Sequence, residues 1–264
     1  MWALGTLGCE LHEDCVDAPV MDAYFEHPLS EEIIAIVQGD SFSEESSLIS
    51  AAELESEDWL ASYRNRVSPL EVGKKFLVDP REPSSAPSVG QSSRQELRIP
   101  ARNAFGTGSH ASTRLVVEFL ESLDLVCKRV VDLGTGTGIL CLVADYLGAS
   151  SVVAIDTDPV AAFSAREVGS LNGMSIAVVA GRIGCLSRRR LFDLALVNIL
   201  PVKVRPDLGD LVDRLDTGGE VIFSGLLDVD VDEFGREIER VGLEAIDERC
   251  DAEWIAIRAR RVSA

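Results

Sequence analysis

Two glycine-rich segments lie close together in the sequence, Asn103–Thr113 (NAFGTGSHAST) and Val130–Leu140 (VVDLGTGTGIL). Each of them leads into a helix-like apolar pattern. Glycine permits positive φ angles and lets the backbone approach a ligand closely. One such turn could be a tight corner, whereas two of them indicate a ligand that is held from two sides.

The second segment has a GxGxG spacing, formed by Gly134, Gly136 and Gly138. The dinucleotide fingerprint needs GxGxxG, and Ile139 stands where its third glycine would be. The shorter turn, preceded by Asp132, suits a nucleoside with an amino-acid tail, which has no pyrophosphate to hold. The alternative is a tight turn that only begins a helix.

Two polar residues end later strand-like runs. Asp156 ends VVAID, about twenty residues after Gly134, where a carboxylate can accept both hydroxyls of a ribose. Asn198 ends FDLALVN, and its carboxamide offers both an acceptor and donors. At that place Asn198 could hold an amine and present a carbonyl to it, or it could cap the following helix.

The elements that must position these residues alternate along the chain after residue 100. The strand-like runs are KRVVDLG, SVVAID, SIAVVAG, FDLALVNI, EVIFSG, LEAIDER and EWIAIRA, and helix-like runs follow the first, second, fourth and fifth of them. Such alternation predicts an α/β, Rossmann-like fold whose ligand lies beyond the carboxyl ends of the strands. The last two runs have no helix between them, so they should form an antiparallel hairpin at the sheet edge.

The first part of the chain has a different pattern. Residues 1–80 predict a small α+β unit, with a strand at Val20–Glu26, a helix that begins at Ser30, and an extended segment at Leu70–Pro80. Residues 82–95 are rich in Ser, Pro and Gly, which is typical of an exposed linker or loop.

Composition and charge exclude several classes. The net charge of −19 argues against direct binding of nucleic acid. No apolar run could span a bilayer and no secretory signal is visible, so we expect a cytoplasmic protein. The six cysteines form no CxxC pair, so we expect no metal site. Residues 1–63 contain fifteen acids and no Lys or Arg. That region is either a soluble, self-repelling surface or a face that attracts a basic partner.

The motifs together resemble those of class I S-adenosylmethionine-dependent methyltransferases. AFGTGSHAST is similar to the AFGTG-x-H-x-[ST]-T signature of the ribosomal protein L11 methyltransferase family, and NIL at residues 198–200 is common there. DWLASYRNRVSPLEVGKKFLVDP resembles the family's linker, and GTLGCEL and MDAYFE resemble parts of its ferredoxin-like N-terminal domain. The resemblance therefore runs over nearly the whole chain.

The resemblance implies a set of residues that bind S-adenosyl-L-methionine: Phe105, Gly106, Thr107, Thr113, Asp132, Gly134, Gly136, Asp156 and Asn198. The first three form a flap over the cofactor, and Thr113 contacts its methionyl end. Asp156 holds the ribose, and Asn198 also faces the reacting amine as the catalytic residue. His110 could act as a base or could only anchor its loop by a hydrogen bond.

The resemblance further implies a domain plan. Residues 1–58 form a substrate-recognition domain, 59–100 a linker, and 101–264 a methyltransferase domain with seven strands. Met1–Gly5 resembles the end of the first ferredoxin-like helix, so we expect that the first strand is missing. Either translation naturally starts upstream, or this domain is looser than the catalytic one.

The expected reaction is N-methylation of lysine or α-amino groups on a basic ribosomal protein by a monomeric enzyme. The alternatives are a lysine methyltransferase for another protein, such as an electron-transfer flavoprotein subunit, a small-molecule amine methyltransferase, and a non-catalytic scaffold. The amine must be neutral to react, which costs a lysine roughly 4 kcal/mol at cytosolic pH. A dry pocket beside a cationic sulfonium lowers the pKa of that lysine.

Overall fold

The computed structural model describes residues 6–12, 20–25, 68–81, 93–100, 108–189 and 191–262. The chain divides into two compact units, Met1–Trp59 and Leu60–Ala264. In the first unit β1 (Thr6–His12) pairs antiparallel with β2 (Val20–Phe25), so the strand expected at Val20 is present. The helix expected at Ser30 lies outside the described residues, and the ferredoxin-like plan of residues 1–58 stays a prediction.

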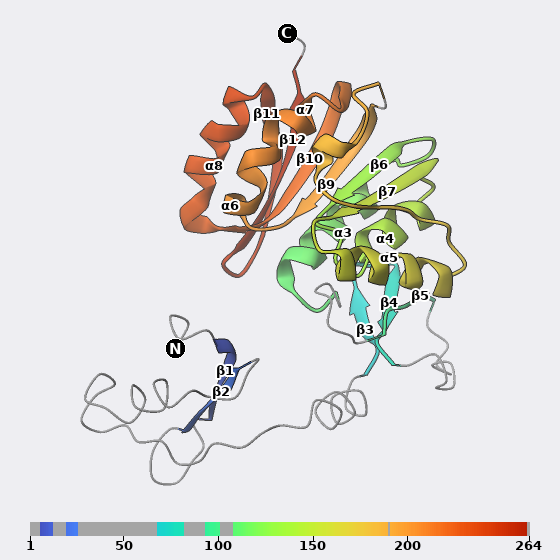
Figure 1. The fold of residues 1–264 in the computed structure, drawn as a ribbon, viewed down its shortest axis with the longest axis vertical. Coiled ribbons are helices and arrows are strands. Elements are labelled where there is room, and N and C mark those ends of the chain that lie inside the picture. The colour runs from blue at the N-terminus through green and yellow to red at the C-terminus, as the bar shows by residue number, and fades with distance from the viewer. Residues whose placement is uncertain are drawn as a thin grey trace, which may run out of the picture. The chain divides into compact units, whose positions relative to one another are not determined.

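The second unit contains the expected seven-stranded sheet, in the order β11-β12-β10-β9-β6-β7-β8 (Figure 1). Its last hairpin, β11–β12, is antiparallel and lies at the edge, as predicted. β12 also pairs antiparallel with β10, and the remaining neighbours are parallel. The strands are β6 (Arg129–Leu133), β7 (Ser151–Asp156), β8 (Ala177–Ala180), β9 (Phe192–Asn198), β10 (Leu215–Leu227), β11 (Leu243–Asp251) and β12 (Trp254–Arg261).

Helices cover both faces of this sheet (Figure 1). They are α3 (Ala111–Ser122), α4 (Ile139–Tyr146), α5 (Pro159–Leu171), η2 (Ile183–Cys185), α6 (Pro201–Val204), η3 (Arg205–Asp207), α7 (Leu208–Val212) and α8 (Asp228–Arg240). Alternate residues of each strand enter different cores, because successive side chains of a strand point to opposite faces. Val130 packs with α3 and α4, whereas Val131 packs with α7 and α8.

A helix expected from about Arg205 to Leu215 is replaced by α6, η3 and α7. The helical path begins earlier than expected because Pro201 is suited to the first turn of a helix, where no backbone N–H is needed. Pro206 interrupts the regular α-helical hydrogen bonding, and the chain forms the 3₁₀ turn η3 there. Leu215 already belongs to β10.

The segment expected as a linker contains a second, three-stranded sheet of β3 (Leu70–Val72), β4 (Phe76–Asp79) and β5 (Gln95–Arg98). Its apolar side chains join the core that α3 and α4 build. The Glu121 carboxylate at the end of α3 accepts backbone hydrogen bonds from Lys74 and Lys75 at 2.6–2.8 Å. These contacts make the small sheet an outer layer of the second unit.

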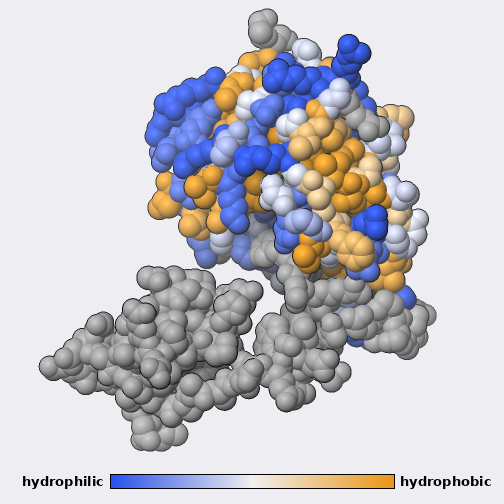
Figure 2. Space-filling model, in the orientation of Figure 1, coloured by the Kyte–Doolittle hydropathy of each residue, from blue (hydrophilic) through white to orange (hydrophobic). Residues whose placement is uncertain are grey.

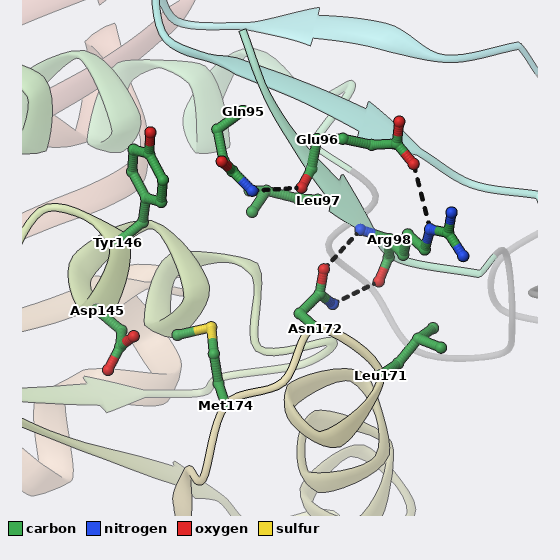
Figure 3. Close-up of a pocket in the computed structure, with 9 residues that line it drawn as sticks. All are labelled: Gln95, Glu96, Leu97, Arg98, Asp145, Tyr146, Leu171, Asn172 and Met174. Carbon is green, nitrogen blue, oxygen red and sulfur yellow. Dashed lines mark hydrogen bonds and ion pairs between the residues drawn. The ribbon is translucent and has the colours of Figure 1, made fainter. Parts of the chain in front are cut away.

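The open edge of β5 is closed by a side chain. The Asn172 carboxamide accepts a hydrogen bond from Arg98 N and donates one to Arg98 O, both at 2.8 Å (Figure 3). Beside it lies a hollow of about 420 Å³, lined in part by Tyr146 and Met174. Because α4 and α5 end there, the hollow lies at the edge of the main sheet opposite to the carboxyl ends of β6 and β7.

Candidate active site

The strand register brings three of the predicted residues to one place. Leu133 at the end of β6 lies beside Ile155 of β7 and Val197 of β9. The next residues along these strands are Gly134, Asp156 and Asn198. The strand order reverses between β6 and β9, so this edge is the switch point at which open α/β sheets bind ligands.

The glycine loop after β6 has an unusual backbone. Gly134, Gly136 and Gly138 have φ angles of 75°, 54° and 82°, a region that favours glycine. An added Cβ at Gly134 would lie 2.4 Å from Cγ2 of Ile199, and one at Gly138 would lie 3.1 Å from Cβ of Ala165. Close packing against Ile199, which follows β9, and against Ala165 of α5 thus accounts for these two glycines, whatever the loop binds.

Asp156 fixes the loop to the next strand. Its Oδ2 accepts a hydrogen bond from Gly136 N at 3.0 Å, and its Oδ1 accepts one from Asp158 N at 3.0 Å. Asp158 in turn caps α5, because its Oδ1 accepts a hydrogen bond from Val160 N at 2.8 Å. The Asp156 carboxylate therefore lies half-buried between the glycine loop and the start of α5.

Asp132 is a buried carboxylate directly before the loop, with 1% of its surface exposed. Its Oδ2 accepts hydrogen bonds from Thr135 Oγ1 at 2.7 Å and from Cys141 Sγ at 3.4 Å. Its Oδ1 is buried and has no hydrogen-bond partner in the described part of the chain. Burial raises the pKa of Asp132 to about 6, against the opposing effect of the two hydrogen bonds.

Asn198 is oriented by α3. Its Nδ2 donates a hydrogen bond to Oγ1 of Thr113, which is fully buried, at 3.1 Å. α6 begins after Leu200 without any side-chain cap, so Asn198 does not cap that helix. An added Cβ at Gly225 (φ 82°) would lie 3.6 Å from Asn198 Oδ1, so this glycine keeps the space beside the acceptor open. The hydrogen bond to Thr113 uses one N–H of the carboxamide and fixes its orientation, and among the described residues no hydrogen bond to its carbonyl oxygen is found, so that oxygen can accept one from a ligand.

His110 has a local structural role. Its Nδ1 accepts a hydrogen bond from Ser112 N at 3.2 Å and thereby caps α3. Its ring packs edge-to-face against the ring of Trp254, with 4.5 Å between the two ring centroids. This is the loop-anchoring alternative to a catalytic base. The flap residues Phe105, Gly106 and Thr107 lie outside the described residues, and their role stays a prediction.

Sequence reasoning missed Ile199, Ser224 and Gly225. Ile199 packs against Gly134, and Ser224 lies beside Asn198 in the register of β10 and β9. The Ser224 hydroxyl donates a hydrogen bond to Ser112 O at 2.9 Å and so ties β10 to the start of α3. The sequence signal for this pair is the SG that ends the strand-like run EVIFSG.

Comparison with known proteins identifies the family of this chain. The family model described as ribosomal protein L11 methyltransferase (PrmA) matches residues 9–262. The chain belongs to the ribosomal protein L11 methyltransferase family. Its members are S-adenosyl-L-methionine-dependent methyltransferases, which confirms the enzyme class and the cofactor expected from the sequence.

Curated members of the family are similar over most of the chain. Ribosomal protein L11 methyltransferase of Symbiobacterium thermophilum is 35% identical over 208 residues, which cover 79% of this chain and 67% of the relative. That of Prochlorococcus marinus is 34% identical over 215 residues, covering 79% and 71%. The matched region thus spans about two thirds of each relative's length.

Solved structures agree with the fold. The crystal structure of a ribosomal protein L11 methylase from Lactobacillus delbrueckii subsp. bulgaricus superposes with a TM-score of 0.67 at 25% identity, covering 75% of this chain and all of that one. A putative RNA methyltransferase from Pyrococcus horikoshii, with a TM-score of 0.51 at 20% identity over 61% of this chain and 87% of its own, shares the fold alone.

The site residues fit a cationic cofactor. The ionised, buried Asp132 has an oxygen without a hydrogen-bond partner among the described residues, and a positive charge at this edge would stabilise that carboxylate. In the same described ranges no cluster of His, Cys, Asp or Glu could hold a metal ion, and no helix is long and apolar enough to cross a membrane.

We expect Asp132→Asn to stabilise the cofactor-free protein at neutral pH and to leave its stability unchanged near pH 3.5. The pKa of Asp132 is about 6 in the folded protein, against 3.8 for an unperturbed carboxyl. Its contribution to stability is therefore largest below pH 3.8 and is lost as the pH rises through 6, at a cost of about 3 kcal/mol. Urea unfolding at pH 7.5 should show a gain of about 1–3 kcal/mol, because the amide forms imperfect hydrogen bonds.

A control of opposite sign is Asp193→Asn. Hydrogen bonds from Arg129 lower the pKa of Asp193, so its ionised form stabilises the fold at neutral pH, and that contribution is lost as the pH falls. The control variant should lose stability at pH 7.5. If Asp132→Asn loses stability there as well, the buried charge is not a cost and the orphaned oxygen has another explanation.

Proposed function

We propose that this enzyme transfers methyl groups from S-adenosyl-L-methionine to lysine or α-amino nitrogens of a ribosomal protein of the L11 type. The observation that carries the proposal is the family match over residues 9–262, joined to a switch point where Asp156, the glycine loop and the Asn198–Thr113 pair converge. The relatives' names supply the substrate class.

In this proposal the glycine loop and Asp156 hold the cofactor, and Asp132 lies beneath them as a fixed negative charge. Bound S-adenosyl-L-methionine supplies a methyl group on a positively charged sulfur, which is already electrophilic. The chain therefore has to orient the amine, exclude water and favour the neutral form of the amine. Phe105, Gly106 and Thr107 would form the flap over the cofactor that the family resemblance implies.

Asn198 suits the amine side of the reaction. Thr113 accepts one N–H of Nδ2 and so fixes the orientation of the carboxamide, which lets Oδ1 accept one N–H of the incoming amine while the nitrogen lone pair stays available for the methyl group. A carboxamide adds no negative charge, so it does not raise the pKa of the amine as a carboxylate would. Asn198 thus positions a neutral amine without stabilising its protonated, unreactive form.

The proposed partner is a basic protein that docks on the acidic first 63 residues, and the proposed place of action is the cytoplasm. The fifteen acids and absence of Lys or Arg in that stretch favour such a partner by charge complementarity. We propose that the enzyme acts as a monomer and makes no direct contact with nucleic acid, in keeping with its net charge of −19.

The test is to incubate whole ribosomes and free ribosomal proteins, prepared from cells without their own L11 methyltransferase, with labelled S-adenosyl-L-methionine and the enzyme. Mass spectrometry of every labelled protein should find methyl groups on lysines or the α-amino group of L11. Label on another protein would redirect the proposal to that substrate. Binding of the cofactor without label on any ribosomal protein would contradict the substrate class.

A further inference from the structure

Exposed apolar side chains lie in the segments that directly follow β9 and β10. Leu200 is 48% exposed, Val202 on α6 is 63% exposed, and Val229 in the first turn of α8 is 83% exposed. α6 follows the carboxyl end of β9, and α8 follows that of β10. These residues therefore lie at the same edge of the sheet as the proposed active site.

Ion pairs hold α6, η3 and α8 side by side. Arg205 Nη2 lies 3.1 Å from Glu233 Oε1, and Arg205 Nε lies 2.8 Å from Glu237 Oε2. Val202 precedes Arg205 by three residues, and Val229 precedes Glu233 by four. Residues at these spacings lie on neighbouring parts of a helix surface. Each valine thus lies about one helical turn before the ion-paired residue of its own segment, on the side of the carboxyl edge of the sheet.

The surface around the valines is mostly acidic. The first six residues of α8, Asp228–Glu233, contain four acids and no base. Lys203 is an exposed base on α6, whereas the charge of Arg205 is balanced by its two glutamates. Figure 2 shows apolar surface at the lower ends of α6 and α8 beside hydrophilic surface of α8. We name Leu200, Val202, Val229, Asp228 and Asp230 the α6–α8 ledge.

We propose that the α6–α8 ledge binds the segment of the protein substrate that flanks the methylated amine, and that this segment is basic and carries an apolar side chain. This inference rests on the proposed function. A segment whose amine is held at Asn198 Oδ1 continues onto the ledge, because Leu200 follows Asn198 by two residues and directly precedes α6. The acids of α8 attract its positive charge, and the valines cover its apolar side chain.

The ledge should affect binding of a protein substrate and not of a small amine. A free amine reaches Asn198 but has no flanking chain to cover Val202 and Val229. Weakening of the ledge should therefore raise KM for the protein, with little effect on kcat or on a small amine, because the ledge supplies binding that is equal in the ground and transition states.

The test compares Val202→Lys and Val229→Lys with Val126→Lys. Val126 is 63% exposed, like Val202, but lies at the opposite edge of the sheet, before β6. The probes are recombinant unmethylated L11 and α-N-acetyl-lysine. We expect the ledge variants to raise KM for L11 about tenfold, and the double variant more, while kcat, S-adenosyl-L-methionine affinity and α-N-acetyl-lysine methylation stay within about twofold of the wild type. The control should resemble the wild type throughout.

Each outcome separates the ledge from the function that it serves. If the wild type methylates L11 and the ledge variants match Val126→Lys, the ledge does not bind substrate. If the wild type sediments as a dimer that the ledge substitutions dissociate, the ledge is an interface between two copies, and this inference is wrong. If the wild type binds cofactor and methylates no ribosomal protein, the proposed function fails before the ledge is tested.

Discussion

Asn198→Ala should lower kcat for the protein substrate by about 10²–10³-fold, the usual cost of removing one oriented hydrogen-bonding group from an active site. The affinity for S-adenosyl-L-methionine, measured by isothermal titration, should change by less than about threefold. The reason is geometric, since the hydrogen bond from Nδ2 to Thr113 fixes the orientation of the carboxamide, whose Oδ1 can then accept from the amine. Normal turnover combined with weak cofactor binding would place Asn198 on the cofactor side instead.

Two further variants separate orientation from charge in this prediction. Thr113→Val removes the hydroxyl that fixes the carboxamide and should lower kcat about tenfold, without adding or removing a charge near the amine. Asn198→Asp keeps an acceptor but stabilises the protonated amine, so its rate profile should move to higher pH. An unshifted profile for Asn198→Asp would show that this side chain does not face the titrating amine.

The main sheet and its ligand edge could be predicted from the sequence because their signals are local. Each apolar run is short and is followed by a polar or glycine residue, and parallel strands place such residues at one edge. Leu133, Ile155 and Val197 are paired in the sheet, which is why Gly134, Asp156 and Asn198 meet. The identity of the cofactor came from the resemblance to a family and not from the strand pattern.

The contacts that orient the site could not be predicted, because they join residues far apart in the sequence. Nothing near Asn198 in the sequence indicates Thr113, which lies 85 residues earlier. Gly134 was expected to serve the ligand, yet in the fold its missing side chain makes room for Ile199. A glycine pattern indicates that a side chain would not fit, but only the packing shows whether a ligand or another protein atom lies there.

The three-stranded sheet could not be predicted from the sequence for a similar reason. β3 and β4 read as one extended segment, and β5 follows a stretch rich in Ser, Pro and Gly. Glu121 near the end of α3 and Asn172 directly after α5 bond backbone groups of the small sheet and so attach it to the main unit. Such tertiary hydrogen bonds leave no periodic pattern, so the segment was expected to be a linker.

Asp156→Ala should weaken S-adenosyl-L-methionine binding by about 2–4 kcal/mol, the value of one or two charge-assisted hydrogen bonds, which is about 30- to 1,000-fold in Kd. Part of this loss is indirect, because the carboxylate also accepts hydrogen bonds from Gly136 N and Asp158 N.

Asp158→Ala is the matched control, since it removes the cap of α5 two residues away and leaves Asp156 in place. The control should cost about 1 kcal/mol of stability and change Kd by less than about threefold. Equal losses of affinity in the two variants would mean that Asp156 acts only by holding the loop against α5, and an unchanged Kd for Asp156→Ala would remove it from the cofactor site.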